Sequence, residues 1–141
     1  MSVERIDHVH IEVADRDRAA DWYRRVLGLR RDPDLAVWAD DPMGPLILQA
    51  GDGQPALSLF ARGCAPPSRD TTIAFRMDGA AFAGFLARLP DLQLSKTDGP
   101  PVTPADVVDH GPSHSIYFAD PDGNRLEVTT YDLDPKRPLQ S

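Results

Sequence analysis

The sequence predicts an α+β domain in which one strand–helix–strands unit occurs twice. The length of 141 residues fits a single domain with a core of its own. An alternating segment followed by a helical stripe opens the chain, and the same order returns after residue 70. Two copies are too few for a solenoid, so we expect two half-sheets side by side, with helices outside and a concave polar face inside.

The first unit opens with "IDHVHIEV" (6–13), which alternates as a strand does. One face carries Ile6, His8, His10 and Glu12, and the opposite, mostly apolar face carries Asp7, Val9, Ile11 and Val13. A helix should cover the apolar face, since Asp15 can cap its start and Gly28 can end it with a positive φ. Its apolar stripe consists of Ala19, Trp22, Tyr23, Val26 and Leu27. Further strand candidates lie at 36–39, 45–50 and 56–61.

The second unit begins with "TIAFRMD" (72–78), which alternates again and precedes a second helical stripe. That stripe consists of Phe82, Phe85, Leu86 and Leu89. A weak strand candidate follows at 92–95, and stronger ones lie at 115–119 and 125–131. The last two flank the turn "DPDGN", in which Pro121 fixes φ and Gly123 or Asn124 can adopt a left-handed conformation.

We therefore expect one domain over residues 1–135. Its first module covers about 5–61 and its second about 71–131. The segment between them, 62–70, is rich in proline and charge and is typical of a connector. Residues 132–141 are expected to form a C-terminal tail.

The charge and the cysteine content exclude several classes of partner and location. A formal net charge of −7 argues against nucleic acid or an anionic membrane, because both require clustered positive charge. No apolar run is long enough to span a bilayer, and the N-terminus shows no signal peptide. The single cysteine, Cys64, excludes an intrachain disulfide and is typical of a reducing compartment. We therefore expect a cytoplasmic protein.

Alternation predicts which side chains line the concave face. From the first unit these are His8, His10, Glu12, Ser58 and Phe60; from the second they are Thr72, Ala74, Arg76, Ser115, Tyr117, Glu127, Thr129 and Tyr131. An inward carboxylate between two apolar residues, such as that of Glu127, needs a partner or a metal. Imidazole and carboxylate are ligands of ferrous iron, zinc and nickel sites, so His8 and Glu127 are candidate metal ligands.

Two segments carry a resemblance to a known family. "HVHIEVADRDRAADWYRRVLGL" (8–29) and "YFADPDGNRLEV" (117–128) resemble the two ends of members of the vicinal oxygen chelate superfamily. That superfamily includes glyoxalase I, the fosfomycin and bleomycin resistance proteins and the extradiol ring-cleaving dioxygenases. The stretch "DHGPSHSIYFADPDGNRLEV" (109–128) looks closest to the dioxygenase-like members. The resemblance, which covers about 5–131, implies two βαβββ modules that form an open, mixed β-barrel or cleft.

The resemblance also implies a divalent metal held by His8 and Glu127, with a further histidine at the start of the second module. Thr72 occupies that place here. Ser58 likewise occupies the place of a carboxylate that some glyoxalase-like members carry. Only two of the implied protein ligands are therefore present, which leaves metal binding open.

The other histidines offer alternatives. His10 faces inward two residues from His8 and could replace the missing ligand. His110 and His114, on the loop that enters the strand of Tyr117, could fold over the mouth of the cavity. We take these two histidines as candidate acid–base groups and Tyr117 as a candidate hydrogen-bond donor to a substrate oxygen, which makes all three candidate catalytic residues.

The candidate substrate-binding residues are His10, Thr72, Arg76, Ser58 and Phe60.

The candidate metal ligands and acid–base groups also have a purely structural interpretation. Among the candidate ligands, His8 could be a hydrogen-bonded histidine of the cavity wall, and Glu127 could form an ion pair with Arg76 across it. His110 and His114 could be ordinary loop residues.

Two functions follow from these alternatives. The first is a metal-dependent enzyme, ring-cleaving dioxygenase-like or a glyoxalase-like lyase, that chelates neighbouring oxygens of a small organic substrate through iron, zinc, nickel or manganese. The second, which Thr72 and Ser58 favour, is metal-independent binding of a small molecule, as in bleomycin-resistance-type members. In either case, the open sheet edges predict a homodimer with twofold symmetry.

Overall fold

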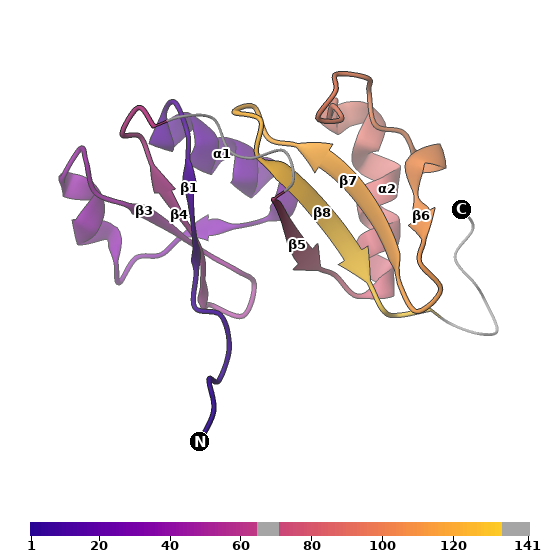
Figure 1. The fold of residues 1–141 in the computed structure, drawn as a ribbon, viewed down its shortest axis with the longest axis horizontal. Coiled ribbons are helices and arrows are strands. Elements are labelled where there is room, and N and C mark those ends of the chain that lie inside the picture. The colour runs from indigo at the N-terminus through magenta and orange to yellow at the C-terminus, as the bar shows by residue number, and fades with distance from the viewer. Residues whose placement is uncertain (65–70, 134–141) are drawn as a thin grey trace. The chain divides into compact units, whose positions relative to one another are not determined.

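The fold consists of two α+β modules, each with a strand, a helix and three further strands along the chain (Figure 1). The computed structural model describes residues 1–64 and 71–133. The chain separates into compact units at residues 1–67 and 68–141, and each unit is described by itself. The predicted α+β class with two βαβββ modules is confirmed. The predicted connector, 62–70, and tail, 132–141, lie largely outside the described residues.

The first module forms a four-stranded mixed sheet in the order β1-β4-β3-β2. Its elements are β1 (Val9–Glu12), α1 (Arg16–Leu27), β2 (Arg30–Arg31), the 3-10 helix η1 (Ala36–Asp40), β3 (Leu46–Gln49) and β4 (Pro55–Phe60). β1 runs parallel to β4, whereas the other pairs are antiparallel. The first strand of the module therefore lies next to its last.

The second module repeats this topology with the order β5-β8-β7-β6. Its elements are β5 (Thr72–Arg76), α2 (Gly79–Leu92), the 3-10 helix η2 (Pro104–Asp106), β6 (Val108–Asp109), β7 (His114–Ala119) and β8 (Arg125–Thr130). β5 runs parallel to β8, and the other pairs are antiparallel.

Neither α1, α2 nor any other helix of the described residues is long and apolar enough to cross a membrane.

The two sheets agree in register as well as in strand order. His10 of β1 lies opposite Ser58 of β4 in the first sheet. Ala74 of β5 lies opposite Glu127 of β8 in the second. Ser58 therefore occupies the position in its module that Glu127 occupies in the other.

α1 packs against the first sheet, and both of its ends are defined by the sequence. The Asp15 carboxylate accepts the backbone N–H of Arg18 at 3.0 Å and caps the start of the helix. Gly28 ends it with a φ of +70°, a backbone conformation that residues with a Cβ rarely adopt. Of the predicted stripe, Ala19, Tyr23 and Val26 are buried, and Trp22 and Leu27 are half-buried.

α2 packs on the second sheet through aromatic side chains. Asp78 caps it by accepting the backbone N–H of Ala81 at 2.8 Å. The ring centroids of Phe85 and Phe118 of β7 are 5.7 Å apart, so α2 covers the face of the sheet that carries Phe118. Alternation along β7 then places Tyr117 on the opposite face. The buried residues of the helix are Phe82, Phe85, Leu89 and Leu92.

The turn between β7 and β8 is organised by the buried Asp120. Its carboxylate accepts the backbone N–H groups of Asp122 and Asn124 at 2.9 and 2.8 Å, and the Asn124 side chain donates to it as well. Gly123 has a φ of +87°, which agrees with the predicted turn. The turn therefore fixes where β8 begins, and with it the position of Glu127 in the sheet.

The predicted strand at 36–39 is wrong, because these residues belong to η1. The guanidinium of Arg16 in α1 donates to the carbonyl oxygens of Ala39, Asp41 and Gly44 at 2.7–3.1 Å, which holds the segment in its turns. The fourth strand of the sheet is instead β2, which has only two residues. An alternation pattern cannot reveal so short a strand.

The predicted strand at 92–95 is also wrong. α2 continues to Leu92, and Gln93 ends it in a left-handed conformation with a φ of +53°. Ser95 makes only isolated bridges to Pro101 and Ala119. The edge strand of the second sheet is again a pair of residues, β6.

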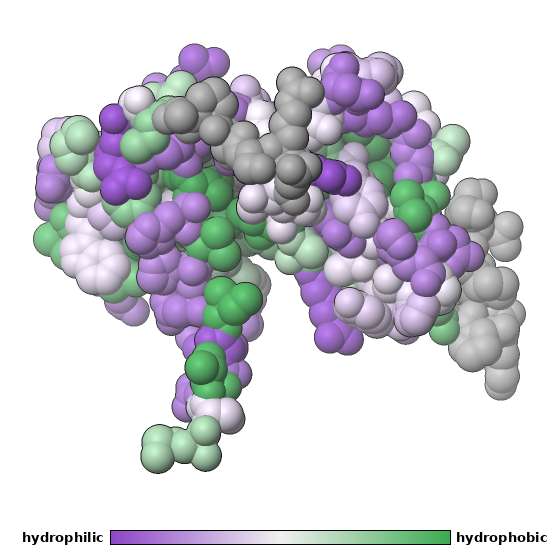
Figure 2. All heavy atoms as spheres, viewed as in Figure 1, coloured by the Kyte–Doolittle hydropathy of each residue, from purple (hydrophilic) through white to green (hydrophobic). Residues whose placement is uncertain are grey.

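The segment before β1 projects from the first module and exposes apolar side chains (Figure 2). Met1, Val3 and Ile6 are all exposed. Arg5 donates to the side-chain oxygen of Gln54, which ties this segment to the turn before β4. This contact holds the backbone in place just before His8.

Candidate functional site

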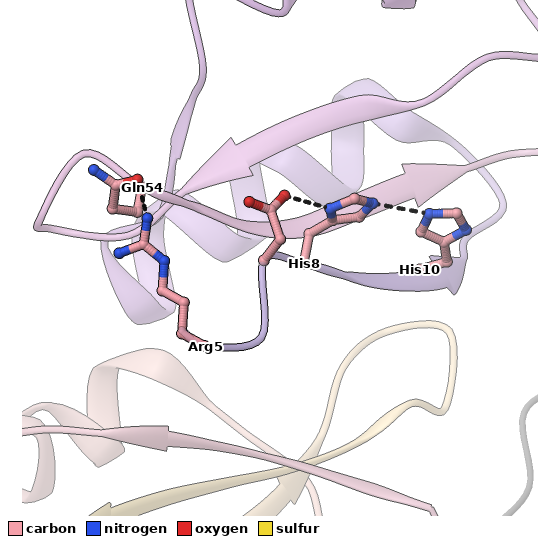
Figure 3. Close-up of polar contacts among 5 residues, drawn as sticks. Arg5, His8, His10 and Gln54 are labelled. Carbon is pink, nitrogen blue, oxygen red and sulfur yellow. Dashed lines mark hydrogen bonds and ion pairs between the residues drawn. The ribbon is translucent and has the colours of Figure 1, made fainter. Parts of the chain in front are cut away.

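His8 and His10 lie next to each other at the start of β1 (Figure 3). The Nε2 atoms of the two rings are 3.1 Å apart, and Nδ1 of His8 is 2.7 Å from Oδ2 of Asp7. An ionised carboxylate only accepts hydrogen bonds, so Nδ1 of His8 is the donor. Nε2 of a neutral His8 therefore carries a lone pair that points towards His10.

Asp7 does not lie where the alternation pattern predicts it, on the apolar face. β1 begins at Val9 rather than at Ile6, so the alternation of a pleated strand does not reach Asp7. Its carboxylate turns instead to His8. An aspartate directly before a histidine is the sequence signal that could have indicated this contact.

The substrate-binding candidates of the first module lie around His10. Ser58 is its neighbour on β4, and the ring of Phe60 lies 4.8 Å from that of His10 between centroids. The Arg62 guanidinium lies over the Phe60 ring at 4.0 Å. Ser58 is fully buried, and its Oγ has no hydrogen-bond partner among the described residues. The hydroxyl is thus closed off from solvent and left without a partner in the described part of the wall beside His10.

Glu12, at the end of β1, is engaged by Arg62. Its carboxylate accepts the backbone N–H of Arg62 at 3.0 Å and the Nε–H of its guanidinium at 2.9 Å. Burial raises the pKa of Glu12, but the hydrogen bonds and the charge of Arg62 outweigh burial and hold this pKa below its usual value. The negative charge of Glu12 is thus already balanced by a neighbour.

In the second module, Glu127 lies half-buried in the middle of β8. Ser115 Oγ donates to Glu127 Oε2 at 2.7 Å and lies 2.9 Å from Thr129 Oγ1. No ion pair joins Glu127 to Arg76 within residues 1–64 and 71–133. The Arg76 guanidinium lies instead over the ring of Tyr131, 4.9 Å from its centroid. The carboxylate of Glu127 is therefore held by a hydroxyl rather than by a cation.

Tyr117 of β7 is the cross-strand partner of Glu127. Its hydroxyl is 3.0 Å from Nε2 of His110, and the Arg125 guanidinium lies 5.1 Å from its ring centroid. Burial raises the pKa of Tyr117, the negative charge of Glu127 raises it further, and the charge of Arg125 offsets part of this rise. The phenol therefore remains protonated, and able to donate a hydrogen bond, well above neutral pH.

A cavity of about 410 Å³ lies beside Tyr117. Lys96, Asp106 and Arg125 supply charged parts of its wall. Lys96 Nζ pairs with Asp106 Oδ1 at 2.9 Å, whereas Arg125 forms no ion pair in the described part of the chain. Arg125 is not among the predicted site residues. It lies two positions before Glu127 in β8, and alternation places both on one face of the sheet, so the same pattern could have identified it.

Thr72 opens β5 and pairs with Arg125 of β8. Thr72 lies two positions before Ala74, as His8 lies two positions before His10, so Thr72 corresponds in register to His8. Across the part of the chain that the structure describes, no three His, Cys, Asp or Glu side chains gather into a group able to hold a metal ion.

The predicted loop position of His114 is wrong. His114 is the first residue of β7 and is 6 % exposed. Alternation places it on the face of the sheet that α2 covers, with Phe118 and away from Tyr117. Its Nε2 lies 3.4 Å from Asp109 Oδ1. Of His110 and His114, only His110 contacts Tyr117 within the described residues.

We expect a tyrosine titration followed by ultraviolet absorbance to report the surroundings of Tyr117. Tyr117→Phe should remove the component that ionises above the ordinary tyrosine pKa of about 10. Glu127→Gln should lower the pKa of this component, because it removes a negative charge that disfavours the phenolate. Tyr131→Phe is the matched control and should leave the component in place. An assigned Tyr117 component that ionises below pH 10 would contradict this view of its environment.

Comparison with known proteins shows which family and which solved structures the chain resembles. A family model described as Glyoxalase/Bleomycin resistance protein/Dioxygenase superfamily matches residues 5–128. The chain is similar to oxidase ChaP-H1, with 23% identity and a TM-score of 0.65 over 91% of this chain and 96% of that one. It is also similar to a glyoxalase/dioxygenase from Nostoc punctiforme, with 20% identity and a TM-score of 0.63 over 90% of each chain.

A third similar structure is the fosfomycin resistance protein FosX from Mesorhizobium loti, with 22% identity and a TM-score of 0.63 over 92% of this chain and 93% of that one. No significant match was found among curated proteins. Structural similarity at these identities shows the fold, and the family model extends over most of the sequence. The chain therefore belongs to the glyoxalase/bleomycin resistance protein/dioxygenase superfamily.

Proposed function

We propose that this chain is a metal-dependent enzyme in which His8 and Glu127 bind a divalent metal ion. The observation that carries the proposal is the contact between Asp7 and Nδ1 of His8. Histidines that bind metals through Nε2 usually donate their other ring N–H to a carboxylate or carbonyl, which fixes tautomer and orientation. Support also comes from Glu127, a half-buried carboxylate whose hydrogen bond from Ser115 orients it without neutralising its charge.

A bound divalent ion would act as a Lewis acid on two neighbouring oxygens of the substrate. Tyr117 would donate a hydrogen bond to a substrate oxygen, since its raised pKa keeps the proton on the phenol. His110, 3.0 Å from that hydroxyl, would accept or return a proton through it. Arg125, beside the same ring, would stabilise negative charge on the substrate.

We propose a small organic substrate and a ring-cleaving dioxygenase or glyoxalase-like lyase reaction, with iron, zinc, nickel or manganese as the ion. The cavity of about 410 Å³, which Tyr117 and Arg125 of the proposed site residues line, falls within the range of small-molecule sites. Thr72 and Arg76 of β5 and Ser58 and Phe60 of β4 would contact the substrate.

We further propose that the protein is a cytoplasmic homodimer. Each four-stranded sheet has edge strands, which offer unpaired backbone groups to a second copy. The single cysteine, Cys64, is exposed and not in a disulfide, which suits a reducing compartment.

Elemental analysis of the purified protein, followed by titration with each of the four ions, tests the proposed function. We expect a single ion per chain, and we expect His8→Ala to lose it. Stoichiometric metal in His8→Ala would overturn the assigned site. Failure of the wild-type protein to bind any of the four ions would overturn metal-dependent function.

The second candidate function is metal-independent binding of a small organic molecule. It is favoured by Thr72, a neutral residue in the register position that corresponds to His8. A thermal-shift screen of organic ligands in the presence and absence of EDTA separates the two functions. Stabilisation that EDTA does not reduce supports the binding protein, whereas stabilisation that requires added metal supports the enzyme.

A further inference from the structure

We infer that His10 is a metal ligand beside His8, so that residues 8–10 of the first module supply two nitrogen ligands. The second imidazole would make up for the threonine at position 72. This inference rests on the proposed function, because it concerns the same site. It changes the role of His10 from a substrate contact to part of the metal centre.

The separation of the two rings fits a pair of neighbouring ligands. Their Nε2 atoms are 3.1 Å apart (Figure 3). Two nitrogens that each lie about 2.0–2.1 Å from one ion, at angles between octahedral and tetrahedral values, are separated by roughly 2.8–3.4 Å. Rotation of the two side chains would have to turn both lone pairs away from the line that joins the nitrogens and towards an ion beside it.

Asp7 selects the tautomer that this arrangement requires. When His8 is neutral and its Nδ1 donates to the carboxylate, its Nε2 carries no proton, and His10 can donate to it from its own Nε2. A divalent ion would replace this shared proton, and His10 would then carry its proton on Nδ1. His10 is exposed, so both the ion and the displaced proton have access to solvent.

The surroundings of His10 point to a polar ligand independently of the ring separation. Ser58 lies opposite His10 in the sheet, is fully buried, and has no partner for its Oγ within the described residues. Buried hydroxyls are normally hydrogen-bonded, and a polar ligand at His10 would supply the partner once the side chains that cover Ser58 Oγ move aside. Phe60 packs against the ring of His10 and limits the orientations it can adopt.

The neighbouring alternatives to His10 are engaged elsewhere. Glu12, two residues further along β1, holds Arg62 through two hydrogen bonds. His114 lies on the α2 face of its own sheet. The hydroxyl of Thr72 is neutral, and hydroxyls are weaker ligands for these ions than imidazole.

Cobalt titration of the full chain, followed by paramagnetic proton NMR and by calorimetry, tests the inference. The wild-type complex should show two strongly shifted, exchangeable ring N–H signals, one from His8 and one from His10. His10→Ala should lose one signal and bind cobalt at least about tenfold more weakly. Asp7→Asn should keep both signals, but the His8 proton should exchange faster with water and affinity should fall by roughly 10–100-fold.

His110→Ala is the matched control, because it removes an exposed histidine of the other module, and it should change neither signal nor affinity. Wild-type affinity and both signals in His10→Ala would overturn the inference while leaving the proposed function intact. Unchanged affinity in Glu127→Gln, with both ring signals present, would instead overturn the assignment of Glu127. Absence of any shifted signal or heat from the wild-type protein would overturn both proposals.

Discussion

Glu127→Gln is expected to weaken zinc or nickel binding by more than the roughly 10–100-fold that follows loss of a residue supporting a metal ligand. The amide keeps the shape of the side chain and can still accept the hydrogen bond from Ser115. It lacks the negative charge that attracts the cation, and its oxygen is a poorer ligand than a carboxylate. Isothermal titration calorimetry on the full chain measures the change.

Glu12→Gln is the matched control for this experiment. Glu12 is also a strand glutamate, but Arg62 already balances its charge. Its replacement should leave metal affinity unchanged and should lower stability by less than about 1 kcal/mol, as for most partly exposed ion pairs. Equal affinity of the wild type and Glu127→Gln would show that the Ser115–Glu127 hydrogen bond serves only the packing of β7 against β8.

Phe85→Ala is expected to lower the free energy of unfolding by about 3–5 kcal/mol. Phe85 is 2 % exposed and packs on Phe118, which is 1 % exposed, with 5.7 Å between ring centroids. Removal of the ring leaves a cavity between α2 and the second sheet that the surrounding side chains can fill only partly. Urea unfolding followed by circular dichroism measures the loss.

Leu86→Ala provides the comparison for Phe85→Ala. Leu86 is the next residue of the same helix but is only half-buried, so its truncation should cost clearly less. Both variants place alanine at a helix-interior position, which keeps differences in helix propensity small. A loss below about 1 kcal/mol in Phe85→Ala would contradict its place in the core.

The elements that could be predicted are those whose pattern extends over several residues. α1 has a capping aspartate, Asp15, an apolar stripe and a terminating glycine, Gly28, all within one segment. β2 and β6 have two residues each, and such strands are defined by the hydrogen bonds of the neighbouring strand rather than by any pattern of their own. η1 could not be predicted either, because its conformation depends on Arg16, which lies twenty or more residues earlier in the chain.

For the candidate site, the sequence indicates which face a residue occupies but not what it contacts. Alternation places Ser115, Tyr117 and Glu127 on one face, yet the hydrogen bond from Ser115 to Glu127 depends on the register between β7 and β8. The ends of strands are the weakest point, since alternation fails where the pleat stops. Asp7 lies just outside a strand and His114 just inside one, and the sequence misplaces both for this reason.

The parallel pairing of the first strand of each module with its last has a consequence for folding. β1 has no partner until β4 has been synthesised, because Val9 pairs with Leu57. Contacts between residues so distant in the chain form slowly, since the intervening loop must be closed first. We therefore expect α1 to form early and β1 to dock late. His8 and His10 would then gain their neighbours on β4 in the final step, which makes ion binding by this pair a reporter of the completed module.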